Sequence, residues 1–263
     1  MSAPGTWRDL PERLVSALVM ALVGGALIWL GGRWFAALVV AVSAVMLWEL
    51  ARMSAPRRKR GALALAWLAA AALTTVLVWH QPLALVLLAL PGLASLARPR
   101  LHPYAVAGYM AALMLSGYGL VALREGAGLV LILWILAVVI ASDLAGYFVG
   151  KAVGGPKFWP AISPKKTWSG TAGGWLAAAA VGAGFVLAGQ APWALVAVSP
   201  LVAFAGQMGD IVESWFKRRA GVKDSSRLIP GHGGALDRFD ALTGAVLAVL
   251  VLGLAGLMPP VGG

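Results

Sequence analysis

The stretch AGLVLILWILAVVIASDLAGYFV, residues 127–149, is the part of the chain that decides its fold class. Asp143 is its only charged side chain, and most other positions are apolar. A helix needs about 20 such residues to cross the hydrocarbon core of a bilayer, which is about 30 Å thick. The stretch therefore predicts a transmembrane helix.

Comparable windows recur along the whole chain. They cover residues 13–32, 34–53, 61–79, 82–98, 104–123, 170–189, 192–215 and 239–258. The sequence thus predicts an all-α, polytopic integral membrane protein with about nine transmembrane helices. The window 82–98 is short and contains Pro91 and Gly92, so it fits either a kinked span or a re-entrant segment. A seven-span arrangement is the alternative if two windows do not cross.

The composition excludes several other classes of protein. Of the 263 residues, 60% are hydrophobic and 12% are charged. A soluble domain carries about a quarter charged residues, and a disordered chain is far less hydrophobic. The chain has no cysteine, which excludes disulfides, thiolate metal sites and cysteine nucleophiles.

The basic residues predict the orientation in the membrane. With the N-terminus in the cytoplasm and nine alternating spans, all of the 21 Lys and Arg residues except Arg33 and Arg124 lie in cytoplasmic segments. Such a bias is what the positive-inside rule describes. It also accounts for the net charge of +11, so we expect no nucleic-acid partner.

Carboxylates gather at the same predicted face. The acids at or beyond the cytoplasmic ends of the sixth, eighth and ninth windows are Asp143, Asp210, Glu213, Asp224, Asp237 and Asp240. Ionisable groups near the membrane are costly unless they are paired or functional. Salt bridges with nearby Lys and Arg are the structural alternative for any one of these acids.

The spacing of these acids indicates a site for a hard cation. Asp210 and Glu213 are three residues apart on a helix, as are Asp237 and Asp240. Oxygen ligands without a His or Cys cluster favour Mg²⁺ or Mn²⁺ over zinc. The neighbouring basic residues suit a phosphate-rich substrate; they are Lys165, Lys166, Lys217, Arg218, Lys223 and Arg238. Metal, carboxylates and cations together are the parts of phosphoryl or nucleotidyl transfer. We therefore divide the chain into N-terminal helices, residues 1–125, and a catalytic region, residues 126–263.

Two glycine-containing loops could bring backbone N–H groups to phosphate oxygens. They are PAISPKKTWSGTAGG, residues 160–174, and LIPGHGG, residues 228–234. The second loop contains His232, Gly233 and Gly234. Neither loop matches the GxxxxGK[ST] phosphate-binding pattern.

The segment SWFKRRAGVKDSSRLIPGHGGALDRFD, residues 214–240, closely resembles the C-terminal signature of the phosphatidate cytidylyltransferases, also called CDP-diacylglycerol synthases. Upstream, the segments SDLAGYFVGKAVG (142–154), ISPKKTWSG (162–170) and GQMGDIVES (206–214) are similar to other motifs of that family. Three positions depart from its usual pattern: Gly146 replaces an Ala, Ser169 a Glu or Gln, and Ala235 a larger aliphatic residue.

The resemblance implies an enzyme of the bacterial inner membrane that converts CTP and phosphatidate to CDP-diacylglycerol and pyrophosphate. It also implies Mg²⁺, with a second cation left open, a homodimer, and an active site facing the cytoplasm. We expect Asp210, Asp237 and Asp240 to bind metal, followed by Asp143 and Asp224, and Lys217 and Arg238 to act in catalysis. The residues expected to bind substrate are Lys165, Lys166, Ser214, Arg218, Lys223, His232, Gly233 and Gly234.

Three other functions remain as alternatives. A CTP-dependent lipid kinase would transfer the γ-phosphate, and its products would be a phospholipid and CDP. A CDP-alcohol phosphotransferase should carry an Asp-Gly-x-x-Ala-Arg segment, which is absent from the sequence. A carrier would place its carboxylates near the membrane midplane, whereas these acids lie at span ends.

Overall fold

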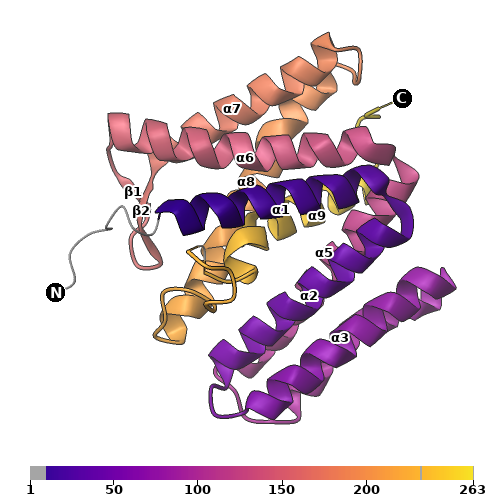
Figure 1. Ribbon diagram of the computed structural model, residues 1–263. Coiled ribbons are helices and arrows are strands. Elements are labelled where there is room, and N and C mark those ends of the chain that lie inside the picture. The colour runs from indigo at the N-terminus through magenta and orange to yellow at the C-terminus, as the bar shows by residue number, and fades with distance from the viewer. Residues whose placement is uncertain (1–9, 232, 263) are drawn as a thin grey trace. The chain divides into compact units, whose positions relative to one another are not determined.

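The computed structural model describes residues 10–231 and 233–262, with side chains from Val15 onward. Helices dominate the chain (Figure 1). The elements are α1 (Leu10–Leu30), α2 (Gly32–Ser54), α3 (Lys59–Trp79), the 3₁₀ helix η2 (Pro82–Ala89), α4 (Leu90–Leu96), α5 (Pro103–Gly126), α6 (Gly128–Val153), β1 (Lys157–Trp159), β2 (Ser163–Thr167), α7 (Trp168–Leu187), α8 (Ala194–Arg219) and α9 (Leu236–Leu254).

This series of helices confirms the predicted class. Within the described residues, six helices are long and apolar enough to cross a membrane, namely α2, α3, α5, α6, α7 and α8. Each predicted window coincides with one of the helices to within a few residues, except 82–98. The chain is therefore a multi-pass membrane protein. Large apolar side chains such as Trp67 on α3 and Leu176 on α7 are 75% and 74% exposed, as expected where a helix faces lipid.

The window 82–98 forms two short helices instead of one long one. Pro82 stands at the start of η2, and Pro91 stands in the first turn of α4. A proline lacks the N–H that a continuing helix requires, so it is tolerated in a first turn and interrupts a helix elsewhere. The proline that made the window ambiguous thus lies where one helix type gives way to another.

The described chain forms two compact units. The first unit consists of the described part of Met1–Ala111 together with Ala220–Arg238. The second consists of Ala112–Arg219 and the described part of Phe239–Gly263. The functional division at residue 125 that the sequence suggested remains a prediction.

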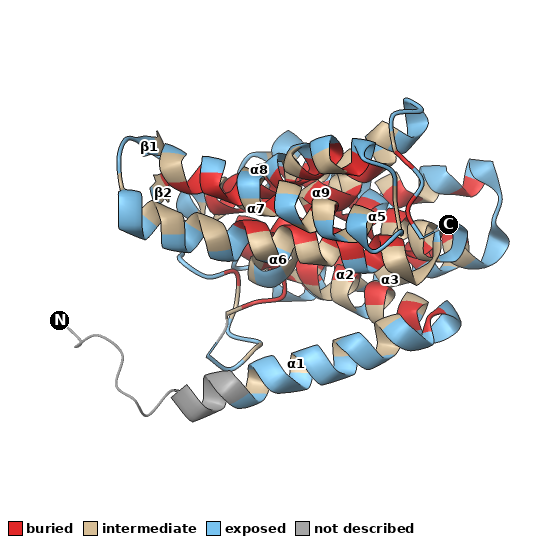
Figure 2. Ribbon diagram, turned by 90° about the horizontal axis from the view of Figure 1, so that it is seen from above, coloured by how far each residue is buried: buried red, intermediate tan, exposed pale blue. Residues whose placement is uncertain are grey.

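The second unit is built around α6, α7 and α8. Its buried core includes Trp134 and Ile135 of α6, Leu195 and Val202 of α8, and Val246 of α9. Figure 2 shows this buried material as red bands along the helices of the unit. The Trp134 indole donates a hydrogen bond of 3.0 Å to the Ser199 hydroxyl, which satisfies a buried polar group across two helices.

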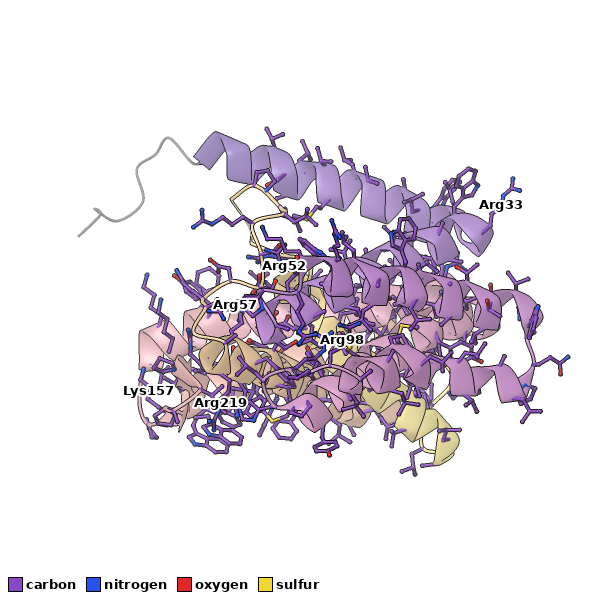
Figure 3. The ribbon with its side chains drawn as sticks, turned by 90° about the horizontal axis from the view of Figure 1, so that it is seen from below. Arg33, Arg52, Arg57, Arg98, Lys157 and Arg219 are labelled. Atoms are coloured by element: carbon purple, nitrogen blue, oxygen red, sulfur yellow. The ribbon has the colours of Figure 1, made fainter. Side chains whose placement is uncertain are left out.

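In the first unit, α2 packs against α3, and the short connections at the end of α2 are tied together by Arg100. The Arg100 guanidinium donates to the backbone oxygens of Ser95 and Ala51, at 3.0 and 3.2 Å. Figure 3 shows Arg52, Arg57 and Arg98 of this unit, with Arg33 far from them at the other end of α2. The first unit therefore has one strongly basic end.

Candidate active site

The site of the second unit begins where α8 and α9 cross at very short range. A Cβ on Gly209 would collide with the backbone oxygen of Asp240, and a Cβ on Gly244 would collide with that of Ala205. At Gly206 it would lie 3.1 Å from the backbone oxygen of Ala241. Small residues of this kind let membrane helices approach closely. The crossing therefore fixes the backbones from which the next residues project.

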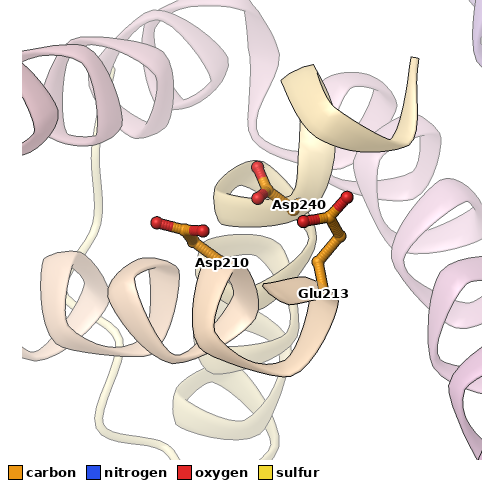
Figure 4. A group of neighbouring side chains, drawn as sticks. All are labelled: Asp210, Glu213 and Asp240. Carbon is orange, nitrogen blue, oxygen red and sulfur yellow. The ribbon is translucent and has the colours of Figure 1, made fainter. Parts of the chain in front are cut away.

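Three carboxylates converge beside this crossing. Asp210 and Glu213 project from α8 and Asp240 projects from α9, and Figure 4 shows them pointing toward one another. One oxygen from each lies within 4.8 Å of the others. Glu213 is completely buried, and Asp240 is 7% exposed. The Ala241 N–H donates to Asp240 Oδ1 at 2.8 Å, which orients that carboxylate.

Two lysines neutralise part of this negative charge. Lys166 of β2 forms an ion pair with Asp210 Oδ2. Lys217, one turn further along α8, lies 2.5 Å from Glu213 Oε2. The Ser214 hydroxyl donates to Asp210 Oδ1 at 3.2 Å. The arrangement combines three acids with two ammonium groups, so salt bridging accounts for two of the three acids.

The β1–β2 hairpin delivers Lys166 to the carboxylates. The sequence predicts a loop over residues 160–174, and this is wrong in part, because Ser163–Thr167 pairs with Lys157–Trp159 and α7 begins at Trp168. Alternate residues of a strand point to opposite faces, so Lys165 and Lys166 face different ways. Lys165 is exposed, whereas Lys166 faces Asp210.

The start of α7 closes the hairpin. The Thr167 hydroxyl accepts a hydrogen bond of 3.1 Å from the Gly170 N–H, which is a typical N-cap. Ser169, which replaces the usual Glu or Gln of the family, donates to the backbone oxygen of Gly154 at the end of α6. Its position therefore serves the packing of the hairpin onto α6.

Gln207, one turn before Asp210, ties α8 to its neighbours. Its amide nitrogen donates to the Ser142 hydroxyl at 3.1 Å, and its amide oxygen accepts from the Trp175 indole at 3.1 Å. A Cβ on Gly174 would lie 2.7 Å from this amide nitrogen, so that glycine provides the space. This buried network was not predicted from the sequence, because no local pattern marks a polar residue whose hydrogen bonds link three helices.

Asp143 lies one residue beyond Ser142 on α6. It is exposed, and the charges of Lys166 and Asp210 act on it. It belongs to the same unit as the three converging carboxylates but is not among them.

Asp237, another predicted metal ligand, belongs to the first unit and accepts hydrogen bonds from the preceding segment. Its Oδ2 accepts from the Ser225 N–H at 2.9 Å, the Ser225 hydroxyl at 2.7 Å and the Gly234 N–H at 2.8 Å. Gly233 has a φ of 85°, a conformation that favours glycine. Asp224 is exposed, and its Cβ lies near Gly233. These contacts give Asp237 a structural role, and a metal role for it stays a prediction.

Glu49 of α2 is a buried acid that was not among the site residues predicted from the sequence. It is completely buried, and its carboxylate accepts four hydrogen bonds from the segment that precedes α9 and from the first residue of that helix. The donors are the Ser226 hydroxyl at 2.6 Å, the Ser225 hydroxyl at 3.2 Å, the Ala235 N–H at 3.1 Å and the Leu236 N–H at 2.7 Å. A Cβ on Gly234 would collide with Glu49 and Ser225. Glu49 is thus a cap for the start of α9.

The structure therefore separates the predicted site residues into two groups. The second unit holds Asp143, Lys165, Lys166, Asp210, Ser214, Lys217, Arg218 and Asp240, and the first holds Lys223, Asp224, Gly233, Gly234, Asp237 and Arg238. His232 lies outside the described residues. Glu213 is the addition to the expected ligand set. Its spacing from Asp210 was visible in the sequence, and its convergence with Asp240 required the helix crossing.

The carboxylate cluster suits a hard divalent cation. Asp210, Glu213 and Asp240 offer oxygen ligands without nitrogen or sulfur, and such a set favours Mg²⁺, Mn²⁺ or Ca²⁺. Lys166 and Lys217 border the cluster and offer donors for phosphate oxygens.

Comparisons with known proteins point to one family. The profile of the cytidylyltransferase family matches residues 11–254. A phosphatidate cytidylyltransferase of Brucella suis biovar 1 is 36% identical over 265 residues, which is 96% of either chain. The Pseudomonas aeruginosa enzyme of that name is 35% identical over 90% of this chain and 94% of its own. That of Staphylococcus aureus is 45% identical over 117 residues, 43% of this chain and 45% of its own.

Proposed function

The chain belongs to the cytidylyltransferase family, and we propose that it uses the cluster of Asp210, Glu213 and Asp240 to transfer the cytidylyl group of CTP to phosphatidate. The products are CDP-diacylglycerol and pyrophosphate. The single observation that carries the proposal is the convergence of three carboxylate oxygens within 4.8 Å beside Lys166 and Lys217. Acids and ammonium groups in one place suit a reaction in which every reacting group is a phosphate.

The chemical step is a direct displacement at phosphorus. An oxygen of the phosphatidate phosphate attacks the α-phosphorus of CTP, the bond from that phosphorus to the bridging oxygen of the β-phosphate breaks, and pyrophosphate leaves. The attacking phosphate is already anionic at neutral pH, so no strong general base is required. The chain therefore contributes positioning and charge neutralisation rather than proton transfer.

Asp210, Glu213 and Asp240 are the residues that would hold Mg²⁺, and the ion would supply neutralising charge to the triphosphate and the lipid phosphate. A second cation and the participation of Asp143 are part of the same proposal. If these carboxylates held a cation, the ammonium groups of Lys166 and Lys217 would be available to phosphate oxygens. Lys165, exposed on the other face of β2, meets solvent and is suited to a first contact with CTP.

The resemblance to the family motif supports a role in substrate binding, metal binding or catalysis for several residues of the first unit. They are Lys223, Asp224, His232, Gly233, Gly234, Asp237 and Arg238, and in the second unit Ser214 and Arg218 join them. Lys223 is exposed, as a phosphate-binding cation should be before substrate arrives. The bacterial relatives and the basic cytoplasmic segments support a bacterial inner membrane, with the site on the cytoplasmic side where CTP is available.

One assay tests the proposed reaction. The purified chain in detergent receives phosphatidate, Mg²⁺ and CTP that is labelled either at the α- or at the γ-phosphate. We expect lipid-soluble label from α-labelled CTP and labelled pyrophosphate from γ-labelled CTP, with no turnover in EDTA. Transfer of the γ-label to lipid would identify a kinase and refute the proposal. Chemical cross-linking in native membranes tests the homodimer that the family resemblance implies.

A further inference from the structure

A basic pocket of the first unit offers a second binding site. Its volume is about 720 Å³, and it opens between the start of α3 and the end of α4. Five cations line it, namely Arg57, Arg58, Lys59, Arg60 and Arg98. We propose that this pocket binds the phosphate of an anionic phospholipid, with an acyl chain along its apolar wall. The residues of the carboxylate cluster all lie in the second unit and take no part in it.

The charge of the pocket is not compensated within it. No Asp or Glu is among its described lining residues, and neither of the ion pairs among the described residues involves its cations. Like charges held close together repel, so an anion from outside is the natural counterpart. The positive-inside rule explains why basic residues lie at this end of α2 and α3, but it does not require them to surround a cavity.

The backbone adds to the attraction for an anion. Helix α3 begins at Lys59, its N-cap residue Arg58 makes no side-chain capping hydrogen bond, and no acid occupies its first turn. The N-terminus of a helix carries a partial positive charge and N–H groups without helical partners. Arg58, Lys59, Arg60 and Gly61 all line the pocket, so this helix end faces it. A phosphate group would satisfy both the backbone and the side chains.

The apolar wall distinguishes a lipid from a soluble phosphate. Ala64, Leu65 and Leu68 of α3 and Ala94 of α4 line the pocket beside the cations. Helix α3 is long and apolar enough to cross a membrane, so this wall continues toward the hydrocarbon core. Basic pockets between membrane helices at the cytoplasmic side are suited to lipid headgroups. An acyl chain can pack along such a wall, whereas inorganic phosphate or pyrophosphate cannot.

The pocket also has a rigid frame. Arg100, two residues beyond the pocket residue Arg98, is held by Ser95, Ala51 and the Ser54 hydroxyl. Burial and, to a smaller extent, the neighbouring charge of Arg58 lower the pKa of the Arg100 guanidinium. Because Arg100 is engaged in this frame, the connections that carry Arg57 and Arg98 are anchored.

The experiment measures the binding of phosphatidylglycerol to the purified full-length chain in neutral detergent by native mass spectrometry. This lipid is not a substrate of the proposed reaction, so the result is separate from CTP turnover. Two variants alter the pocket. R57Q/R60Q/R98Q removes three exposed cations, and Ala94→Trp fills the pocket without changing the charge. R33Q/R124Q/K151Q removes three cations elsewhere and is the matched control.

We expect R57Q/R60Q/R98Q to weaken the binding of the first phosphatidylglycerol by at least about tenfold, since each cation near a membrane surface contributes about fivefold. Ala94→Trp should also weaken it, because the indole occupies the space that the lipid needs. The control should bind as the unmodified chain does, and phosphatidylcholine should bind no variant differently. Equal losses in the control, or unchanged binding by Ala94→Trp, would show general surface attraction and overturn the proposal. Displacement of the lipid by micromolar CTP or pyrophosphate would overturn it in favour of a soluble phosphate ligand.

Discussion

Replacing Glu49 by glutamine tests whether this buried carboxylate holds residues 224–237 in place. Each of the two carboxylate oxygens accepts two hydrogen bonds. Oε1 accepts from the Ser226 hydroxyl and the Ala235 N–H, and Oε2 accepts from the Ser225 hydroxyl and the Leu236 N–H. A glutamine amide has one oxygen and one NH₂ group. Whichever way it turns, its NH₂ group faces one backbone N–H that then has no acceptor.

The expected cost follows from that orphaned group. A buried N–H without a partner costs about 1–3 kcal/mol, while the serine hydroxyls can rotate and accept from the NH₂ group. Glu49→Gln should therefore lower the free energy of unfolding by about 1–3 kcal/mol. Glu49→Ala orphans both N–H groups and leaves a cavity, so its cost should be about twice as large.

Two measurements check this expectation. Thermal unfolding in detergent can be followed by the fluorescence of the 12 tryptophans, and each kcal/mol should lower Tm by roughly 2–4 °C. Limited trypsin digestion reports how accessible the segment that Glu49 holds is to protease. Arg227 lies within that segment, Lys223 lies beside it, and both are exposed. Cleavage there should accelerate in Glu49→Gln, and CTP turnover should fall. Glu125→Gln, which removes an exposed acid of α5, is the matched control. Unchanged Tm and unchanged cleavage in Glu49→Gln would refute the capping role.

Three further predictions concern the site and the topology. Asp240→Asn and Asp210→Asn should each lower turnover by at least ~10², the scale of losing one electrostatic stabiliser, with Tm retained; near-normal rates in both would remove them from the metal role. Gly209→Ala places a Cβ against the Asp240 backbone oxygen, so both Tm and turnover should fall, whereas Gly184→Ala, at an open position, should change neither. Because the chain lacks cysteine, Arg57→Cys and Gly126→Cys give single thiols. In intact cells, only the thiol at position 126 should react with an impermeant maleimide, and the reverse pattern would invert the topology.

The membrane helices could be predicted from the sequence because hydropathy is a local property. Each window needed only its own residues, and Pro91 marked the one window that the structure breaks. Two members of the carboxylate cluster could be singled out for the same reason. Asp210 and Asp240 were visible as acids at helix ends, and their convergence with Glu213 depends on how α8 crosses α9.

Contacts between distant residues could not be predicted in this way. Glu49 and Ser225 are 176 residues apart, and nothing in the sequence around Glu49 indicates so distant a partner. Only the folded chain shows that its carboxylate caps α9. Gln207 was likewise a single polar residue within a quoted motif. Its structural role depends on its hydrogen bonds with Ser142 and Trp175, which belong to two other helices.

The glycine crossing of α8 and α9 has a consequence for ion selectivity. At Gly209 and Gly244 the two backbones already pack against each other without a Cβ between them, so the helices cannot move closer together. The side chains of Asp210 and Asp240 are short and can move their carboxylates only a small distance. Mg²⁺ takes oxygens at roughly 2.0–2.1 Å and Ca²⁺ at roughly 2.3–2.6 Å. If the cluster holds a divalent cation as proposed, adjustment to the ionic radius would have to come from Glu213, whose side chain is the longest of the three. Glu213→Asp should then change which divalent cation supports the proposed reaction.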